Sequence, residues 1–504
     1  SFMIENNKIL LGKAEDLPVY LLPQMMNRHG LIAGASGTGK TVTLKVIAEG
    51  LSELGVPTFI ADIKGDLTGM IVPGDMAGIA GRVESMGLQD FKTCRYPVQF
   101  FDVFGEQGHP VRSTCDSMGA QLFSRLLDLS DAQSGILNII YRVARDMELC
   151  MDDLKDLRIM TQYVGDHASD FTIQYGNVSK QSVGAIQRHL LTLEEEGGEI
   201  FLGKPELDLY DWFKTEDGRG VMNILECQKL FNKPTLYATF MMWLLTELYD
   251  RLPEVGDLDK PKMVFFFDEA HLFFNNAPKA LLEKMEQLIK LIRSKGVGVF
   301  FITQSPADIP DTVLAQCSNR IQHALRAYTP AEIKTVKMAA QSFRVNPDLD
   351  TVETITNMKT GTALVSVLDE EGAPTIVQKT KICPPSSSME MAPQSEISIE
   401  IKSDLIYGKY ETEQEAVSAY EKVSEMYLAE EAAKQAEEEA KEQAKLEKEQ
   451  AKEQARIEKE AERKKKQQQS TLDRIKKKTI TKVENEASKL LVKSAKSLIT
   501  GLFK

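Results

Sequence analysis

One eight-residue segment restricts the folds open to this chain more than any other feature. It reads Gly34-Ala35-Ser36-Gly37-Thr38-Gly39-Lys40-Thr41, which is a complete G-x-x-x-x-G-K-[ST] phosphate loop. The apolar run 31–33 precedes it and the helix-forming run 42–49 follows it, so the loop stands between a strand and a helix. Its glycines let backbone N–H groups point toward phosphate oxygens at the positive end of the helix dipole. A glycine-rich turn that matched by chance would not need these flanks, so the segment predicts a nucleoside triphosphate site.

The chemistry expected at this site needs a cation, a base and a metal ligand. Lys40 would reach the β- and γ-phosphates, and Thr41 would hold Mg²⁺ through its hydroxyl. The apolar run 263–267 ends in Asp268 and Glu269. In a phosphate-loop ATPase the first acid accepts a hydrogen bond from a water on Mg²⁺ and the second polarises the attacking water. Acids after a strand often only cap the next helix, but together with the phosphate loop they favour a metal role for Asp268 and a base role for Glu269.

Two further positions are candidates for sensing and for transition-state stabilisation. The next long apolar run ends at Thr303 and Gln304. Gln304 could touch both the γ-phosphate and the water, although a turn or capping residue would look the same. Arg293, just before that run, could reach the γ-phosphate held by a neighbouring subunit. An arginine near a helix end is also an ordinary surface residue, and Arg320 and Arg326 compete for the same role.

A charged loop follows the second expected strand. It reads Asp62-Ile63-Lys64-Gly65-Asp66, and its acids belong to the carboxyl edge of the sheet, where ligands of α/β folds gather. The acids could order the site or pair with a neighbour's arginine. An ordinary turn after a strand explains them equally well, and both interpretations stay open.

Short apolar runs alternate with helical segments over residues 3–381. The expected strands are 31–33, 58–61, 98–101, 221–225, 264–267, 297–302, 321–325 and 363–367. Continuous apolar runs suit strands buried on both faces of a parallel sheet, so we expect a doubly wound α/β domain with helices on both faces. Residues 1–103 form its first part, with the phosphate loop, and residues 213–383 its second part, with the acidic pair, sensor and arginine. A helical insertion fills residues 104–212.

The remainder of the chain has a different composition. We expect a linker at 384–408, a charged helix or partly disordered spacer at 409–478, and a basic amphipathic helix at 479–504. Acid–base pairs one helical turn apart support a solvated helix; they are Glu430–Lys434, Glu437–Lys441, Glu460–Lys464 and Glu462–Lys466. A coiled coil needs an apolar seam, and only Leu446 and Ile457 are large and apolar between 429 and 462.

The last segment carries one apolar face with lysines elsewhere. That face holds Ile480, Val483, Ala487, Leu490, Leu491, Leu498 and Leu502. A basic amphipathic helix can dock on another subunit of the same assembly, on an anionic membrane surface or on nucleic acid. Docking on the protein's own assembly is the first choice, and the other two stay open.

Charge and cysteine usage exclude several classes. The net charge of −13 gives no global basic field, so any contact with DNA has to be local. The six cysteines are scattered without a C-x-x-C pair, which argues against zinc or a disulfide framework and favours a reducing, cytoplasmic location. No apolar stretch reaches the length of a membrane span, and no signal peptide is recognisable.

Taken together, these motifs resemble the HerA/FtsK division of hexameric phosphate-loop ATPases, and most closely the bacterial HerA-like helicase C-terminal-domain family. The carriers are the segments 31–41, 62–66, 267–271, 296–306 and 319–327, and the resemblance covers about residues 5 to 385. It implies a RecA-like core and a hexameric ring with ATP and Mg²⁺ at subunit interfaces. It also implies a motor on duplex DNA, and it assigns Arg293 to the arginine that acts in trans.

The sequence departs from HerA in two places. HerA has an N-terminal β-barrel that docks a nuclease, whereas about 30 residues precede the phosphate loop here, so a nuclease partner is not expected. The charged tail also lies outside the ATPase motifs.

Two functions from different classes remain in view. The first is an ATP-hydrolysing ring motor, a DNA translocase or helicase. The second is an ATP-gated assembly or scaffold ATPase that acts on protein or membrane partners through its tail. A nuclease is disfavoured, because no acid cluster outside the ATP site could bind its metals.

Overall fold

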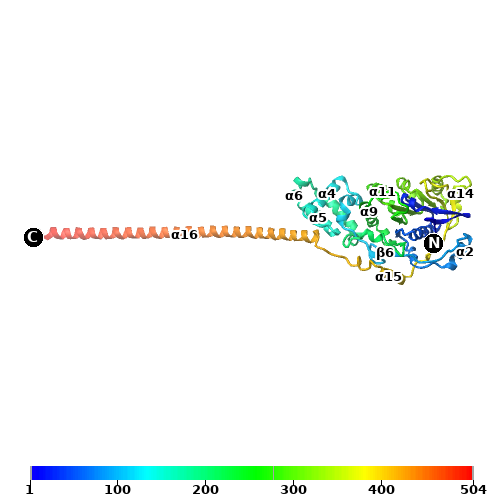
Figure 1. Ribbon diagram of the computed structural model, residues 1–504. Coiled ribbons are helices and arrows are strands. Elements are labelled where there is room, and N and C mark those ends of the chain that lie inside the picture. The colour runs from blue at the N-terminus through cyan, green and yellow to red at the C-terminus, as the bar shows by residue number, and fades with distance from the viewer. Residues whose placement is uncertain (1–2, 276, 502–504) are drawn as a thin grey trace. The chain divides into compact units, whose positions relative to one another are not determined.

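The computed structural model describes residues 3–275 and 277–501, and it divides the chain into two compact units (Figure 1). The first unit spans residues 1–423 and the second residues 424–504. Leu502, placed above on the apolar face of the tail, lies outside the described residues.

A single 13-stranded sheet forms the centre of the first unit, in the order β1-β2-β15-β14-β13-β4-β12-β11-β5-β10-β6-β7, with β3 beside β2. The strands of its parallel part are β4 (Gly30–Ala33), β5 (Thr58–Asp62), β6 (Val98–Asp102), β7 (His109–Pro110), β10 (Met222–Glu226), β11 (Met263–Phe267), β12 (Val297–Thr303) and β13 (Asn319–Gln322). The antiparallel part comprises β1 (Ile4–Glu5), β2 (Lys8–Ala14), β3 (Leu17–Leu21), β14 (Thr362–Ser366) and β15 (Gln378–Ile382). A separate hairpin pairs β8 (Thr215–Glu216) with β9 (Arg219–Gly220).

The parallel strands are apolar throughout because both of their faces are covered. Side chains alternate along a strand, so Ile60 of β5 belongs to the same core cluster as Leu44 of the helix that follows the phosphate loop. Phe59, next to Ile60, points to the other face, where it stacks on Trp212 at 4.7 Å and lies 6.3 Å from Phe240. This double burial confirms the mainly parallel α/β sheet predicted from the sequence.

The helices that accompany the sheet are α1 (Lys40–Glu53), α2 (Met76–Ser85), α9 (Pro234–Arg251), α10 (His271–Phe274), α11 (Lys279–Ile292), α12 (Asp311–Leu314), α13 (Pro330–Gln341), α14 (Thr351–Asn357) and α15 (Gln394–Ser403). Short 3₁₀ turns are η1 (Pro23–Arg28), η2 (Thr68–Ile71), η3 (Leu209–Trp212), η4 (Leu230–Asn232), η5 (Arg293–Lys295) and η6 (Pro306–Asp308).

One predicted strand is shifted, and most of the antiparallel strands were not predicted. The run 321–325 was expected as a strand, but β13 covers Asn319–Gln322. It ends there because its partner β4 stops at Ala33, which pairs with Gln322 just before the phosphate loop. Of the antiparallel strands only β14 was anticipated. β15, for example, reads Gln-Lys-Thr-Lys-Ile and carries no apolar run.

Six helices occupy the middle of the chain and gather at the end of the unit opposite α14 (Figure 1). They are α3 (Cys115–Leu126), α4 (Asp131–Asp146), α5 (Leu154–Asp166), α6 (Ala168–Tyr175), α7 (Lys180–Glu195) and α8 (Gly198–Phe201). Capping boxes at Ser130 and Asp153 fix the starts of α4 and α5. Because these helices belong to the same compact unit as the sheet, the boundaries 104 and 212 of a separate insertion stay a prediction.

Residues 384–418, here called the strap, differ from the linker expected at 384–408 because the strap packs on the first unit. Glu49 of α1 is buried and accepts hydrogen bonds from the backbone of Ser386 and Ser387 at 2.8 Å each. Lys45 of α1 donates to the carbonyl of Ser388 at 2.6 Å. Helix α15 of the strap then passes beside β6 (Figure 1). The strap is therefore anchored to the helix that follows the phosphate loop.

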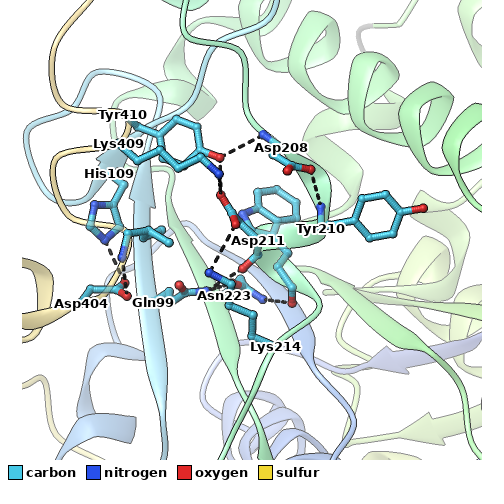
Figure 2. Close-up of polar contacts among 12 residues, drawn as sticks. Gln99, His109, Asp208, Tyr210, Asp211, Lys214, Asn223, Asp404, Lys409 and Tyr410 are labelled. Carbon is cyan, nitrogen blue, oxygen red and sulfur yellow. Dashed lines mark hydrogen bonds and ion pairs between the residues drawn. The ribbon is translucent and has the colours of Figure 1, made fainter.

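Further along, the strap makes a cluster of polar contacts around the buried His109, Asp211 and Tyr410 (Figure 2). His109 of β7 bonds Asp404 through Nε2 at 2.9 Å and Glu411 through Nδ1. Asp211 accepts from Lys409 at 2.6 Å and from the Tyr410 hydroxyl at 2.5 Å. These contacts fix the strap to the edge of the sheet.

Replacing His109 by alanine is expected to lower the free energy of unfolding of the first unit by about 3 kcal/mol at pH 6, because it leaves partly buried carboxylates without their cation. Burial opposes protonation of His109, but the hydrogen bonds and charges of Asp404 and Glu411 outweigh it and raise the pKa above the ordinary 6.5. The stabilisation is therefore complete below pH 6.5 and is lost as the pH rises through the folded-state pKa. Urea denaturation at pH 6 and pH 9 measures this, with His189→Ala as control. A difference from the parent protein that does not change with pH would contradict the ionic role.

The second unit consists of one continuous helix. Helix α16 runs from Ala419 to Gly501 without a break, so the charged segment and the amphipathic segment lie on one continuous helix. Residues 431–500 are exposed. Two of the expected pairs form, Glu437–Lys441 at 2.6 Å and Glu460–Lys464 at 3.4 Å. None of the helices in residues 3–275 and 277–501 has the length and apolar character that a membrane span requires.

Candidate functional site

The phosphate loop connects β4 to α1 and is held open by glycine geometry. Gly37 and Gly39 have φ of +77° and +105°, where a side chain would be strained. A Cβ on Gly34 would lie 2.4 Å from the Cβ of His323. Lys40 is buried and donates to the carbonyls of Gly34 at 2.5 Å and Ala35 at 3.1 Å. Burial lowers its pKa, and the nearby acids partly offset this.

His323, which the motifs did not identify, stabilises the phosphate loop through two hydrogen bonds. His323 is buried, and burial lowers its pKa to about 4, so the ring is neutral at pH 7. Its Nδ1 lies 2.9 Å from the Thr38 carbonyl, which can only accept, so Nδ1 carries the proton. Its Nε2 then accepts from the Thr43 hydroxyl at 2.8 Å. His323 thus ties the loop to the first turns of α1.

The loop at 359–361 supports the phosphate loop from another direction. Thr360 donates to the Gly37 carbonyl at 3.1 Å, and the Gly361 N–H donates to the Thr38 carbonyl at 3.2 Å. Neither position has a sequence signal beyond a glycine in a turn, so sequence reasoning missed both.

Sheet register brings the acidic pair next to the phosphate loop. β12 lies between β4 and β11, and Phe267 pairs with Phe301 while Thr303 pairs with Ala33. The two segments that follow β4 and β11 therefore emerge at one edge of the sheet, as the parallel arrangement predicted.

Glu269 occupies a strained backbone position and is held by a lysine. Its φ is +50°, which is uncommon for a residue with a side chain. Lys64 Nζ lies 3.0 Å from its Oε1, and His271 Nδ1 lies 3.3 Å from its Oε2 without hydrogen-bond geometry. Asp268 is buried and accepts from the Glu269 N–H at 2.8 Å. Burial, then the charge of Glu269, raises the pKa of Asp268 to about 6.

The charged loop after β5 also belongs to this site. Asp62 is buried and accepts from the N–H groups of Gly65 and Leu67, which shapes the loop. Burial, then the charge of Asp66, raises the pKa of Asp62 to about 7. Asp66 Oδ2 accepts from the Thr41 hydroxyl at 3.3 Å, and Asp66 Oδ1 is buried without a hydrogen-bond partner among the described residues.

These oxygens suit Mg²⁺. Within residues 3–275 and 277–501 no group of three or more His, Cys, Asp or Glu could hold a metal ion by itself. Mg²⁺ is usually bound through one or two carboxylates and completes its shell with phosphate and water. The Thr41 hydroxyl, the Asp268 carboxylate and the unpartnered Asp66 oxygen supply such a set, and a cation there would favour the charged form of Asp268.

The sensor candidate faces a cavity beside the phosphate loop. Gln304 is exposed, and it lines a cavity of about 430 Å³ together with Ala35, Ser36 and Arg326. Thr303 is instead buried and donates to Asp308 at 3.1 Å. Gln304 is therefore open to a ligand at the loop, and Arg326 lies within reach of the loop of its own chain.

Arg293 lies away from this site. It begins η5 at the amino end of β12, whereas the phosphate loop follows the carboxyl end of the neighbouring β4. The seven residues of β12 span about 20 Å, so Arg293 and the phosphate loop lie at opposite ends of the strands. Arg293 is exposed and cannot serve the loop of its own chain. Arg320 donates to the carbonyls of Cys317 at 3.1 Å and Leu314 at 3.0 Å, so its guanidinium is already engaged.

Comparison with known proteins finds one family over nearly the whole chain. The sequence pattern of the family described as "Helicase HerA-like C-terminal" matches residues 7–502. The match extends further than the motifs, which covered about residues 5 to 385, and it takes in α16. A protein of Methanocaldococcus jannaschii named "Probable helicase MJECL08" is 29% identical over 154 residues. That match spans 29% of this chain and only 28% of the relative.

Solved structures of a coupling protein share the fold. The unbound monoclinic form of the bacterial conjugative coupling protein TrwBdeltaN70 has a TM-score of 0.53 at 14% identity, over 78% of this chain and 92% of that chain. The plasmid coupling protein TrwB with the non-hydrolysable ATP analogue ADPNP has a TM-score of 0.53 at 16% identity, over 78% and 93%. TrwB with ADP and Mg²⁺ has a TM-score of 0.51 at 14% identity, over 76% and 92%. At these identities the likeness concerns the fold.

Proposed function

The chain belongs to the family of HerA-like helicase C-terminal domains, and on this premise we propose that it is an ATP-hydrolysing motor that assembles as a hexameric ring and moves DNA. The observation that carries the proposal is the meeting of the Lys40 loop, the Thr41–Asp66 contact and the Asp268–Glu269 pair at one edge of the sheet. TrwB, which shares the fold, holds ADPNP in one structure and ADP with Mg²⁺ in another. This supports ATP and Mg²⁺ as ligands here.

Each side chain has a distinct task in this mechanism. Lys40 turns from the loop carbonyls to the β- and γ-phosphates and balances their charge. Thr41 and Asp268 would hold Mg²⁺, with Asp66 orienting the Thr41 hydroxyl; when bound, the ion neutralises phosphate charge. Glu269 orients the attacking water and accepts its proton.

The remaining tasks fall to Gln304 and Arg293. Gln304 senses the γ-phosphate from the cavity wall next to the loop. Arg293 lies at the opposite edge of the sheet from the phosphate loop of its own chain and cannot reach it. It therefore serves the ATP site of the next subunit.

A subunit-mixing experiment tests this arrangement. Arg293→Ala alone should lower ATP turnover by roughly 10³-fold, and Lys40→Ala alone should also be inactive. When the two variants are mixed in equal amounts within one ring, about a quarter of the interfaces combine an intact Lys40 with an intact Arg293. Turnover should therefore return to about a quarter of the parent value. If mixing restores nothing while the variants co-assemble, Arg293 does not act across the interface.

DNA dependence tests the motor itself. Duplex DNA is expected to stimulate ATP turnover of the full chain, and particle mass should correspond to a hexamer. The stimulation should persist in a chain ending after Val423, and it should weaken as salt rises because phosphate contacts release counterions. A monomer without any DNA response would contradict the ring motor. DNA binding by α16 alone, without stimulation, would favour the scaffold ATPase instead.

A further inference from the structure

A second cavity lies well away from the phosphate loop, where the helices of the middle segment meet α9 and α11. Its volume is about 900 Å³. Residues of α3 and α4 line one side of it, and residues of α9 and α11 line the other. No residue of the phosphate loop or of the acidic pair contributes to it. The cavity is thus a separate feature of the first unit, and the ATPase mechanism does not use it.

Three cations line this cavity without partners of their own. Arg125 from α3, Arg145 from α4 and Lys284 from α11 make no ion pair or hydrogen bond within the described part of the chain. Arg142, also in the wall, differs because it pairs with Asp146 at 3.2 Å. Burial and then the charge of Arg125 lower the pKa of Lys284, and the charge of Asp250 partly offsets them, so the two cations are close enough to repel each other. A bound anion would relieve that repulsion.

The wall next to Arg125 is opened by a break in its helix. Within α3, Gly119 has φ of +76° and ψ of +162°, so the helix is interrupted there. A Cβ at this position would meet no atom within 4 Å, and Ala120 beside it is small. The left-handed φ requires glycine. The interruption therefore leaves open space in the wall, where a continuous helix with a larger residue would project into the cavity.

The lining identifies the class of ligand. Binding cavities for small molecules measure about 300–1,000 Å³, and this one is of that size. Arginine and lysine together suit phosphate, arginine because its planar fork can bind two oxygens. Asp116, Glu148 and Asp250 line the same cavity, and their carboxylates can accept from hydroxyl or amino groups of a ligand.

From these features we propose that the cavity binds a small phosphorylated ligand of nucleotide size, with its phosphate between Arg125 and Lys284 and its hydroxyl or amino groups facing Asp250. This site is additional to the ATP site and takes no part in hydrolysis.

The chain contains its own reporter for this site. Cys150 lines the cavity and is exposed, whereas the other cysteines are buried or half-buried. Thiol modification of the full chain by a small disulfide reagent, mapped by peptide mass, measures access to Cys150. Adenosine monophosphate and inorganic pyrophosphate are the probes. The reagent reaches Cys150 only while the cavity holds no ligand. A probe at ten times its Kd leaves about a tenth of the cavities empty, so it should slow modification of Cys150 about tenfold.

Variants separate this cavity from the ATP site. Lys284→Gln and Arg125→Gln should each abolish the protection, while Lys290→Gln, an exposed lysine of the same helix outside the cavity, should keep it. Protection should persist in Lys40→Ala, and ATP turnover should be unchanged in Lys284→Gln.

Three outcomes would overturn the proposal. They are the absence of saturable protection by either probe, protection that survives both Lys284→Gln and Arg125→Gln, and protection by a single-stranded oligonucleotide only. The last would assign the cavity to nucleic acid. None of them affects the proposed ATPase, whose test is turnover in the Lys40 variant.

Discussion

Replacing Lys40 by alanine should lower ATP turnover by at least roughly 10²–10³-fold, the loss seen when a single preorganised donor to a developing negative charge is removed. Lys40 is buried beside the loop, and its ammonium needs only to turn from the Gly34 and Ala35 carbonyls to reach a phosphate. A coupled assay of phosphate release measures the effect, with circular dichroism to verify folding.

Lys337→Ala is a matched control for this result, since Lys337 is an exposed helical lysine that does not line the cavity beside the loop. The control should keep full turnover. If the Lys40 variant also kept full turnover, the loop would not be the catalytic nucleotide site, and the proposed function would fail with it.

Replacing Glu269 by glutamine should lower turnover by about 10²–10⁴-fold, the usual contribution of a general base, while nucleotide binding is retained. Glutamine keeps the shape of the side chain but cannot accept a proton from water, and it loses the ion pair that Lys64 makes at 3.0 Å. Turnover and the binding of a fluorescent ATP analogue should be measured on the same preparation.

Glu283→Gln serves as the control, because Glu283 is an exposed glutamate in an i,i+4 pair with Lys279. Its turnover should not change. A parallel fall of binding and turnover in Glu269→Gln would indicate a structural role, and unchanged turnover would place the base elsewhere.

The core of the site could be predicted because its parts are local in sequence and one rule of sheet geometry joins them. The phosphate loop and the Asp268–Glu269 pair are each contiguous, and both follow apolar runs that are parallel strands. Carboxyl ends of parallel strands share an edge, so proximity followed without coordinates. The arrangement of β12 between β4 and β11 then leaves Gln304 facing the cavity at the loop.

Other parts depend on contacts between distant segments that no local pattern encodes. Ser386 and Glu49 are 337 residues apart. A Pro-Ser-rich stretch is typical of a linker, and nothing in its sequence shows that a buried carboxylate binds its backbone. His323 belongs to the segment 319–327, which carries part of the family resemblance, but no local pattern indicates what this side chain does. Its role follows from its hydrogen bonds with Thr38 and Thr43. Among the antiparallel strands that were not predicted, β15 is polar and β1 is only two residues long.

The strap also lies beside the end of the sheet. β7, the last strand on its side, is only two residues long, and its His109 bonds Asp404 and Glu411 of the strap. A protease cut within residues 384–418 would therefore do more than remove α16, because it would also loosen the partners of the buried His109 at this end of the sheet.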